Sequence, residues 1–327
     1  MSQISRRALL QAGAAAVPLT FSGLAFSQDK FPSKPVTLIV PQPAGGDADV
    51  VCRTLQTKMQ EVLGQAVIID NRGGAGGNIG TALGAKAAPD GYTVTFVNQG
   101  TMALNPSLYP STGYKVSDLA PVTWLASIDL IIVANPSVPA NSLKEFLELA
   151  RKEPGKYTYG TAGNGSANHL AGEMLKSMAK VDITHVPYKG GAPAIVAVLG
   201  GEISTVVAFP LAALPHIKSG KLKALAVTGK KRSKALPDVP TVAESGVSGY
   251  EFASWFGLTV PKGTPEPIIQ KIHTAVAAAL KDKDVAEKLS SGMTEPVGAG
   301  PKEFGELIQR ESDRWSKLIK QYGMKID

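Results

Sequence analysis

Residues 65–78 read QAVIIDNRGGAGGN, an apolar stretch of strand length that runs into glycines and then into a residue suited to a helix start. An apolar run bounded by turn residues predicts a short buried strand. The same order of strand, small-residue loop and helix occurs over residues 35–59 and again from residue 92. Strands that alternate with helices form parallel sheets with helices on both faces. The first hundred residues therefore predict an α/β fold.

A second series of the same kind begins near residue 130. The expected strands lie at residues 130–134, 157–161, 183–187, 204–208 and 222–227, with helices between them. A further strand at 256–261 precedes two long helices, and the last helix carries apolar residues at helical spacing. Because these helices have no sheet of their own, we expect them to pack on the first series. The chain would then cross between two lobes near Ser127 and near Tyr250.

The domain prediction follows from these crossings. Residues 28–127 plus 250–327 form the expected lobe 1, and residues 128–249 form the expected lobe 2. Each lobe is predicted to hold a mainly parallel sheet flanked by helices. A chain of 327 residues, 44% of them hydrophobic, is long enough for two such units.

The N-terminus predicts an export signal over residues 1–27. Arg6 and Arg7 precede an apolar stretch from Ala8 to Leu24, and small residues follow where a signal peptidase cleaves. The paired arginines are typical of the twin-arginine route, but ordinary signals also carry two arginines, so the route stays open. We expect a periplasmic protein that is not embedded in the membrane once the signal is removed.

Composition argues against several other functions. The net charge of +7 is spread along the chain, and its densest run, Lys230 to Arg232, lacks interleaved aromatic residues, so nucleic acid is not an expected partner. The single cysteine, Cys52, has no partner for a disulfide and is expected to be a buried helix residue. The four histidines show no metal-ligand spacing, so neither a metal nor a cofactor is expected.

Ligand is expected where the small-residue loops lead into helices, at residues 44–49, 73–78 and 161–166. Ligands of open α/β sheets sit beyond the carboxyl ends of the strands. Glycines let the backbone approach a ligand closely, and the N–H groups at a helix start favour an anion. A carboxylate is the simplest such anion. Each loop alone is also compatible with an ordinary turn, but three in equivalent positions of two repeats favour a binding cleft.

The sequence resembles the Bug-type receptors, the extracytoplasmic substrate-binding proteins of tripartite tricarboxylate transporters. The matching segments span nearly the whole chain after the signal. They include Lys34–Val36, Ala44–Gly46, Asp70–Gly80, Pro89–Thr93, Tyr159–Gly163, Val186–Gly190, Leu199–Gly201, Leu214–Ile217, Trp255–Leu258 and Pro261–Pro265. The resemblance implies a two-lobed periplasmic binding protein of type II-like architecture that closes on its ligand.

The resemblance also implies the ligand and its contacts. Family ligands are mostly carboxylated, and the carboxylate is held largely by backbone N–H groups and water in the loops of lobe 1, with residues of lobe 2 closing over it. The expected ligand-binding residues are Gln42, Gly45, Gly46, Asp47, Asp49, Gly76, Gly77, Asn78, Thr161, Gly163, Ser166, His169 and Ala208. The implied partners are a small carboxylated solute and the membrane subunits of a tripartite transporter, and we expect a monomer.

Three of these residues depart from the family pattern. The family usually carries an aromatic residue where Gln42 stands, Ser or Thr where Asp47 stands, and often Asp near Ala208. If Asp47 faces the cleft, its charge repels a second carboxylate and favours a cationic or amide-bearing group. If it caps the helix, it is neutral for selectivity. Both alternatives stay open at the level of sequence.

Two other functions compete with a transport receptor. Ser166 and His169 lie three residues apart, on one face of the expected helix, and would serve a periplasmic hydrolase. The absence of a G-x-S-x-G turn and of an orienting acid argues against catalysis, so no enzyme is expected. A receptor that signals to a membrane sensor cannot be told from a transport receptor by sequence.

Overall fold

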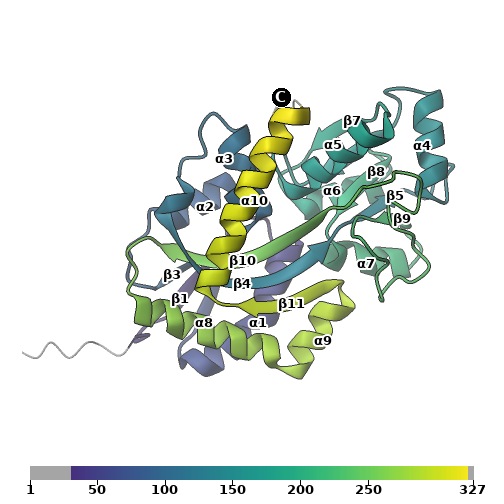
Figure 1. The fold of residues 1–327 in the computed structure, drawn as a ribbon. Helices are drawn as coiled ribbons and strands as arrows, with labels where there is room; N and C mark the ends of the chain where they lie inside the picture. The colour runs from purple at the N-terminus through teal and green to yellow at the C-terminus, as the bar shows by residue number, and fades with distance from the viewer. Residues whose placement is uncertain (1–30, 323–327) are drawn as a thin grey trace, which may run out of the picture. The chain divides into compact units, whose positions relative to one another are not determined.

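The computed structural model describes residues 31–322, and the expected export signal at residues 1–27 lies outside them. The first of two sheets has six strands in the order β11-β4-β10-β3-β1-β2. Its strands are β1 (Val36–Val40), β2 (Val67–Asn71), β3 (Thr93–Asn98), β4 (Leu119–Asp129), β10 (Ala253–Pro261) and β11 (Thr294–Ala299). Both ends of the described chain therefore contribute to this sheet, as Figure 1 shows by colour.

The second sheet has five strands in the order β7-β6-β8-β5-β9. Its strands are β5 (Ile131–Ala134), β6 (Thr158–Thr161), β7 (Thr184–Pro187), β8 (Thr205–Ala208) and β9 (Lys223–Val227). All five come from the middle of the chain, and all five lie within one residue of the strands expected from sequence. The predicted α/β architecture with two helix-flanked sheets is confirmed.

The prediction of mainly parallel sheets is wrong, because both sheets are mixed. β1 pairs in parallel with β2 and β3, and β6 pairs in parallel with β7 and β8. The remaining pairings, which involve β4, β10, β11, β5 and β9, are antiparallel. The physical reason is the path of the chain. β4 runs toward the second sheet and β10 returns from it, so two neighbouring strands must run in opposite directions.

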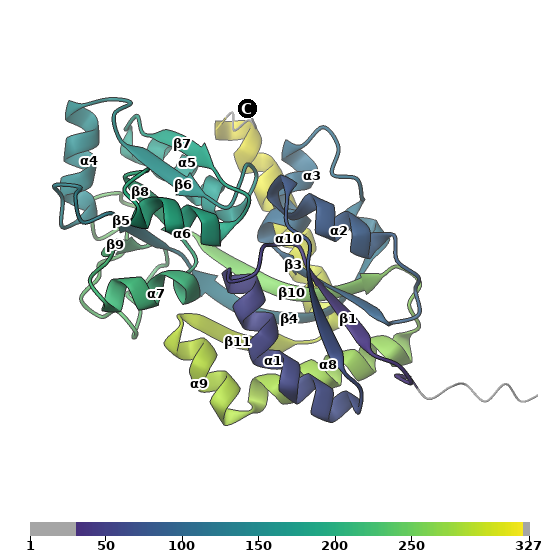
Figure 2. The same cartoon turned by 180° about the vertical axis from the view of Figure 1, so that it is seen from behind.

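Helices cover both faces of the first sheet. In Figures 1 and 2, α2 (Asn78–Ala85), α3 (Asn105–Leu108) and α10 (Pro301–Tyr322) lie above the strands. On the opposite side lie α1 (Asp47–Leu63), α8 (Glu266–Lys281) and α9 (Lys283–Ser291). The second sheet is flanked by α4 (Leu143–Lys152), α5 (Ala167–Ala179), α6 (Gly191–Leu199) and α7 (Pro210–Lys218). Short helical turns occur at Ala75–Gly77, Gly100–Leu104 and Val116–Asp118.

The C-terminal helix α10 packs on the first sheet, as the apolar stripe in the sequence predicts. The buried residues of this stripe are Phe304, Leu307, Ile308, Trp315 and Ile319. The ring of Phe304 meets Trp255 of β10 edge-on, with centroids 5.5 Å apart. Burial of a large aromatic side chain is worth a few kcal/mol, so this stripe fixes α10 on the sheet.

The two chain crossings are joined by one buried threonine, Thr228, which follows β9. Its hydroxyl accepts a hydrogen bond from the N–H of Leu130 at 2.8 Å and donates one to the carbonyl of Phe252 at 2.8 Å. Its own backbone bonds to the same two residues, at 2.9 Å each. Leu130 follows β4 and Phe252 precedes β10, so Thr228 holds the outgoing and returning chains side by side.

We predict that Gly257→Ala destabilises the protein. A Cβ at this position of β10 would lie 2.0 Å from the buried ring of Phe304, which cannot swing away because Trp255 packs against it. We expect a loss of about 1–3 kcal/mol in the free energy of unfolding, measured by urea denaturation.

Gly305→Ala is the matched control. It lies next to Phe304 in α10, where a Cβ would have ordinary contact with Pro121 at 3.6 Å. An alanine inside a helix is favoured over glycine by roughly 1 kcal/mol, so this variant should be neutral or more stable. Equal stability of both variants would contradict the packing described for α10.

Candidate functional site

Loops from both sheets surround a pocket at the carboxyl ends of β1, β2, β3 and β6. This glycine pocket, with about 360 Å³ of empty space including its opening, is lined by Pro41, Gln42, Pro43, Gly74, Gly76, Gly77, Asn98, Ala162, Ser166, Ala167, Asn168, Lys189 and Gly190. A second and smaller space, the Asp47 pocket, has about 210 Å³ of empty space including its opening. It is lined by Asp47, Thr161, Ala162, Gly191, Ala194, Ile195, Val206, Val207, Ala208, Phe209 and Ala212. Ala162 borders both pockets.

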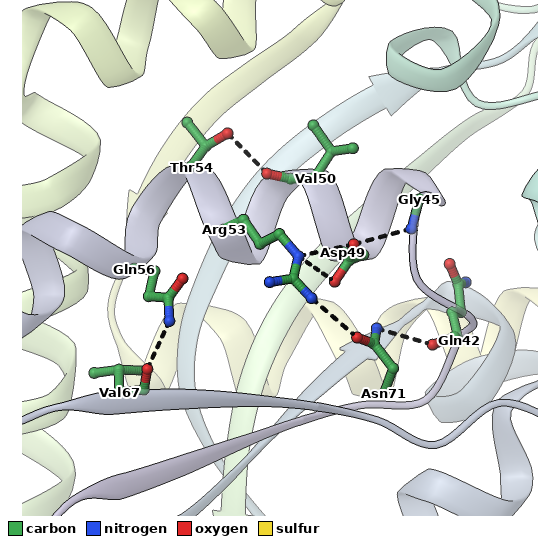
Figure 3. Close-up of polar contacts among 9 residues, drawn as sticks. All are labelled: Gln42, Gly45, Asp49, Val50, Arg53, Thr54, Gln56, Val67 and Asn71. Atoms are coloured by element: carbon green, nitrogen blue, oxygen red, sulfur yellow. Dashed lines mark hydrogen bonds and ion pairs between the residues drawn. The ribbon is translucent and has the colours of Figure 1, made fainter.

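Asp49 shapes the loop before α1 and does not line either pocket. Its buried carboxylate accepts hydrogen bonds from the N–H of Gly45 and from Nε of Arg53, both at 2.9 Å, as Figure 3 shows. Arg53 also reaches Asn71, whose amide donates to the carbonyl of Gln42 at 3.1 Å. Burial raises the pKa of Asp49, but the bonds from Arg53 and Gly45 outweigh it and hold the pKa below its ordinary value. Asp49 is thus an ionised anchor for residues 42–45.

Asp47, the first residue of α1, is buried with 4% of its surface exposed. Its carboxylate accepts the N–H of Ala212 in α7 at 3.1 Å. Burial is the largest influence on this group and raises its pKa to about 7, although backbone hydrogen bonds act in the opposite direction. The alternative in which Asp47 caps α1 is wrong, because the N-cap of α1 is Gly46 and no side chain caps it.

The loop before α2 owes its shape to glycines. Gly74, Gly76 and Gly77 have φ values of 125°, 62° and 94°, which side chains disfavour. A Cβ on Gly76 would lie 2.6 Å from the carbonyl oxygen of Asn164, so this loop lies directly against the loop after β6. Asn78 follows as the first residue of α2 and accepts a hydrogen bond from Asn105 Nδ2 at 2.6 Å.

The loop after β6 is supported by two stacked histidines. The N–H of Gly163 donates to Thr161 Oγ1 at 3.2 Å, and the N–H of Gly165 donates to His169 Nδ1 at 3.2 Å. Thr161 Oγ1 lies 2.6 Å from His185 Nε2, and the two imidazole rings stack with centroids 4.2 Å apart. Burial, followed by the neighbouring His169, lowers the pKa of His185 to about 3, so this ring is neutral. His185 therefore supports the loop through Thr161 without adding charge.

The glycine pocket suits an anion. α5 begins at Ala167 and α2 at Asn78, and residues at or beside both helix starts line the pocket. The N–H groups at a helix start and the helix dipole stabilise negative charge. Lys189 adds a cationic side chain to the lining. Among residues 31–322, no cluster of three or more His, Cys, Asp or Glu side chains could hold a metal ion.

Residues 51–324 match the family model described as tripartite tricarboxylate transporter family receptor. The chain belongs to this receptor family. The family identification made from the sequence motifs is therefore confirmed. Among the helices of residues 31–322, none combines the length and apolar composition needed to cross a bilayer.

Individual relatives of the receptor family resemble the chain over almost its whole length. BugT of Bordetella pertussis is 37% identical over 302 residues, which cover 92% of this chain and 93% of that protein. The structure of R. palustris Rpa4515 with adipate aligns with a TM-score of 0.88 and 36% identity, covering 90% and 99% of the two chains. The structure of MatC from Rhodopseudomonas palustris with bound malate aligns with a TM-score of 0.84 and 33% identity. The alignment covers 88% of this chain and 100% of that chain.

The thirteen residues expected to bind ligand fall into three groups. Gln42, Gly76, Gly77 and Ser166 line the glycine pocket. Asp47, Thr161 and Ala208 line the Asp47 pocket. The remaining six, Gly45, Gly46, Asp49, Asn78, Gly163 and His169, line neither pocket and lie in the loops or helix starts around them.

Three residues in or around the site, Asn168, His185 and Tyr109, were not predicted from the sequence. Asn168 is 2% exposed and lines the glycine pocket, and its Oδ1 has no hydrogen-bond partner while its Nδ2 donates to Val207. His185 supports Thr161, and Tyr109 donates from its hydroxyl to the Asn164 carbonyl at 2.5 Å. An amide one residue beyond the predicted helix start was a signal for Asn168. The other two are reached only through the three-dimensional fold.

We predict that ionisation of Asp47 destabilises the protein as pH rises. Its folded pKa lies above the ordinary value of 3.8, so its contribution to stability is fully present at low pH. That contribution should be lost as pH rises from about 4 to about 7, amounting to a few kcal/mol at most. Urea denaturation should find Asp47→Asn equal to or below the wild type in stability at about pH 4 and above it at about pH 8.

The comparison isolates Asp47 from other acids. Asp129, whose pKa burial raises to about 6, acts in the same direction but is present in both proteins. Parallel pH profiles for the wild type and Asp47→Asn would contradict the prediction.

Proposed function

We propose that this chain is a periplasmic solute-binding receptor that captures a small carboxylate-bearing molecule between two closing lobes, without changing it chemically. The observation that carries the proposal is the glycine pocket, where loops from both sheets and the N-terminal ends of two helices meet beside Lys189. Adipate and malate occupy the two similar proteins named above, and both molecules are carboxylates.

In this proposal, lobe 1 (residues 28–127 plus 250–327) closes against lobe 2 (residues 128–249) when the ligand binds. Two hydrogen bonds join the proposed lobes. The hydroxyl of Tyr109 in lobe 1 donates to Asn164 in lobe 2, and the N–H of Ala212 in lobe 2 donates to Asp47 in lobe 1. We expect the bond from Tyr109 to depend on closure. Short glycine loops on both sides favour such an approach because no side chain keeps them apart.

The proposal excludes catalysis at Ser166 and His169. The hydroxyl of Ser166 accepts the backbone N–H of His169 at 3.2 Å and thereby caps α5. The Nδ1 atom of His169 accepts the N–H of Gly165. These bonds use both groups to hold the loop, whereas a hydrolase needs the serine hydroxyl hydrogen-bonded to a base.

The proposed physiological partners follow from the receptor family. A tripartite tricarboxylate-type membrane transporter would take the solute from the receptor, which would act as a monomer. Export would depend on residues 1–27, by the twin-arginine route or the general one. Nucleic acid has no place in this role, since the positive charges are not gathered around aromatic side chains.

A ligand screen tests the receptor role. Native mass spectrometry of freshly purified protein identifies any ligand retained through purification, and thermal denaturation is then measured with dicarboxylates, aromatic acids, aliphatic acids and amino acids. A ligand at about a hundred times its Kd should stabilise the folded protein by about 2.7 kcal/mol and raise Tm accordingly. No shift with any member at millimolar concentration would refute the role, as would turnover of an ester panel that is lost in Ser166→Ala.

We predict that Tyr109→Phe weakens ligand binding through loss of the closed-state bond to Asn164. A hydrogen bond contributes about 0.5–1.5 kcal/mol net, so Kd for the best acid of the screen should rise by roughly 2- to 10-fold in calorimetric titration. Tm of the ligand-free protein should change little.

Tyr114→Phe is the control for this variant. Its hydroxyl donates to the carbonyl of Thr101, and both residues belong to lobe 1. The control should lower Tm but leave Kd unchanged. An unaltered Kd in Tyr109→Phe would contradict the proposed closure.

A further inference from the structure

The Asp47 pocket differs chemically from the glycine pocket beside it. Apart from Asp47 and Thr161, its lining comes from glycine, alanine, valine, isoleucine and phenylalanine, and no lysine, arginine or histidine is among its lining residues. Ala162 lies in the wall of both pockets, so the two spaces are neighbours.

The anion-binding groups at the Asp47 pocket are already occupied. Pro210 is the first residue of α7 and has no N–H, so the first donors of this helix start are Leu211 and Ala212. The N–H of Ala212 bonds to the carboxylate of Asp47 at 3.1 Å, and the N–H of Leu211 also acts to lower the pKa of this group. A helix start pointed at a pocket would otherwise favour an anionic group of the ligand. Here the anion comes from the receptor itself.

We propose that Asp47 takes the position of a second ligand carboxylate, so that the receptor selects monocarboxylates with an uncharged, mainly apolar tail over dicarboxylates of the same length. This selectivity rests on the proposed receptor function. A second ligand carboxylate would meet a buried carboxylate whose hydrogen-bond donors are taken and which lacks a neighbouring cation. Two carboxylates in one low-dielectric site repel each other strongly. An apolar tail gains instead from contact with Ile195, Val206 and Phe209.

Neighbouring charges do not offset that of Asp47. The nearest charged residues of its own helix, Asp49 and Arg53, pair with each other. The basic residues of α7 are His216 and Lys218 in its last turn, away from the helix start that contacts Asp47. α6 and β8, which supply most of the remaining lining, have no titratable residue. Protonation of Asp47, whose pKa is near 7, should therefore relieve the repulsion.

Hexanoate and adipate test the proposal, because they have the same carbon count and differ in the second carboxylate. Calorimetric titration at about pH 8 should give the wild type a Kd for hexanoate at least about tenfold lower than for adipate, a difference of about 1.4 kcal/mol. Asp47→Asn should reduce this ratio about tenfold or more. Asp129→Asn, which removes a half-buried acid that lines neither pocket, should leave the ratio unchanged.

A measurement on the wild type alone guards against a variant that fails to fold. The Kd for adipate should fall at least about threefold between about pH 8 and about pH 6.5, while that for hexanoate stays constant. Tighter binding of adipate than hexanoate at about pH 8, or an unchanged ratio in Asp47→Asn, overturns the selectivity and leaves the receptor role intact. Absence of binding by both acids and by the whole ligand screen overturns the receptor role and the selectivity together.

Discussion

The close approach of two backbones at Gly76 is the constraint on which the site depends. A single added carbon at this position would lie 2.6 Å from the Asn164 carbonyl and 2.9 Å from the hydroxyl of Tyr109. The loop before α2 can therefore meet the loop after β6 only as bare backbone. The left-handed conformation of Gly76 and Gly77 adds the curvature that turns the chain into α2 within a few residues. The close fit of the two loops beside the pocket follows from this absence of side chains.

Asp47 and Asp49 lie in one turn of α1, but their pKa values shift in opposite directions because their hydrogen-bond partners differ. Arg53 and the N–H of Gly45 surround Asp49, so the carboxylate stays ionised and anchors its loop. Asp47 has only backbone donors from another helix, and burial dominates. Asp49 is therefore a charged structural residue, whereas Asp47, two residues earlier, has a pKa near neutral pH. Of the two alternatives for Asp47, the helix cap is absent, and the side chain instead lines a pocket and bonds to α7.

Most of the fold follows from local patterns, but its antiparallel half does not. β1, β3, β5, β8 and β9 are largely apolar, and together with the more polar strands β2, β6 and β7 they lie where the sequence predicts them. β4 was missed because Pro121 interrupts it, yet Pro121 lies beyond the stretch that pairs with β11 and so breaks no ladder on that side. β11 carries Pro296 and a glycine at positive φ, which are typical of loops. Its pairing with β4 depends on contacts more than 150 residues apart in sequence.

The site was predictable where its residue types carry the signal. Glycine loops and helix starts identified the segments that line the glycine pocket. His185 and Tyr109 lie in a strand and in an unremarkable turn, and only packing brings them to the loop after β6. The donors that hold Asp47 come from a helix that begins more than 160 residues later. No local pattern can express such a pairing, because it exists only once both sheets are formed.

The fourfold hydrogen bonding of Thr228 has a consequence for kinetics. Because the outgoing and returning chains are bonded to one residue where they pass between the sheets, we expect them to bend together about a common line. Twisting or sliding of one half against the other would break several of these bonds at once, whereas swinging about this line would not. In the proposed closure, a connection tied in this way would leave the two halves few relative orientations to explore. Little orientational entropy would then be lost when the loops meet.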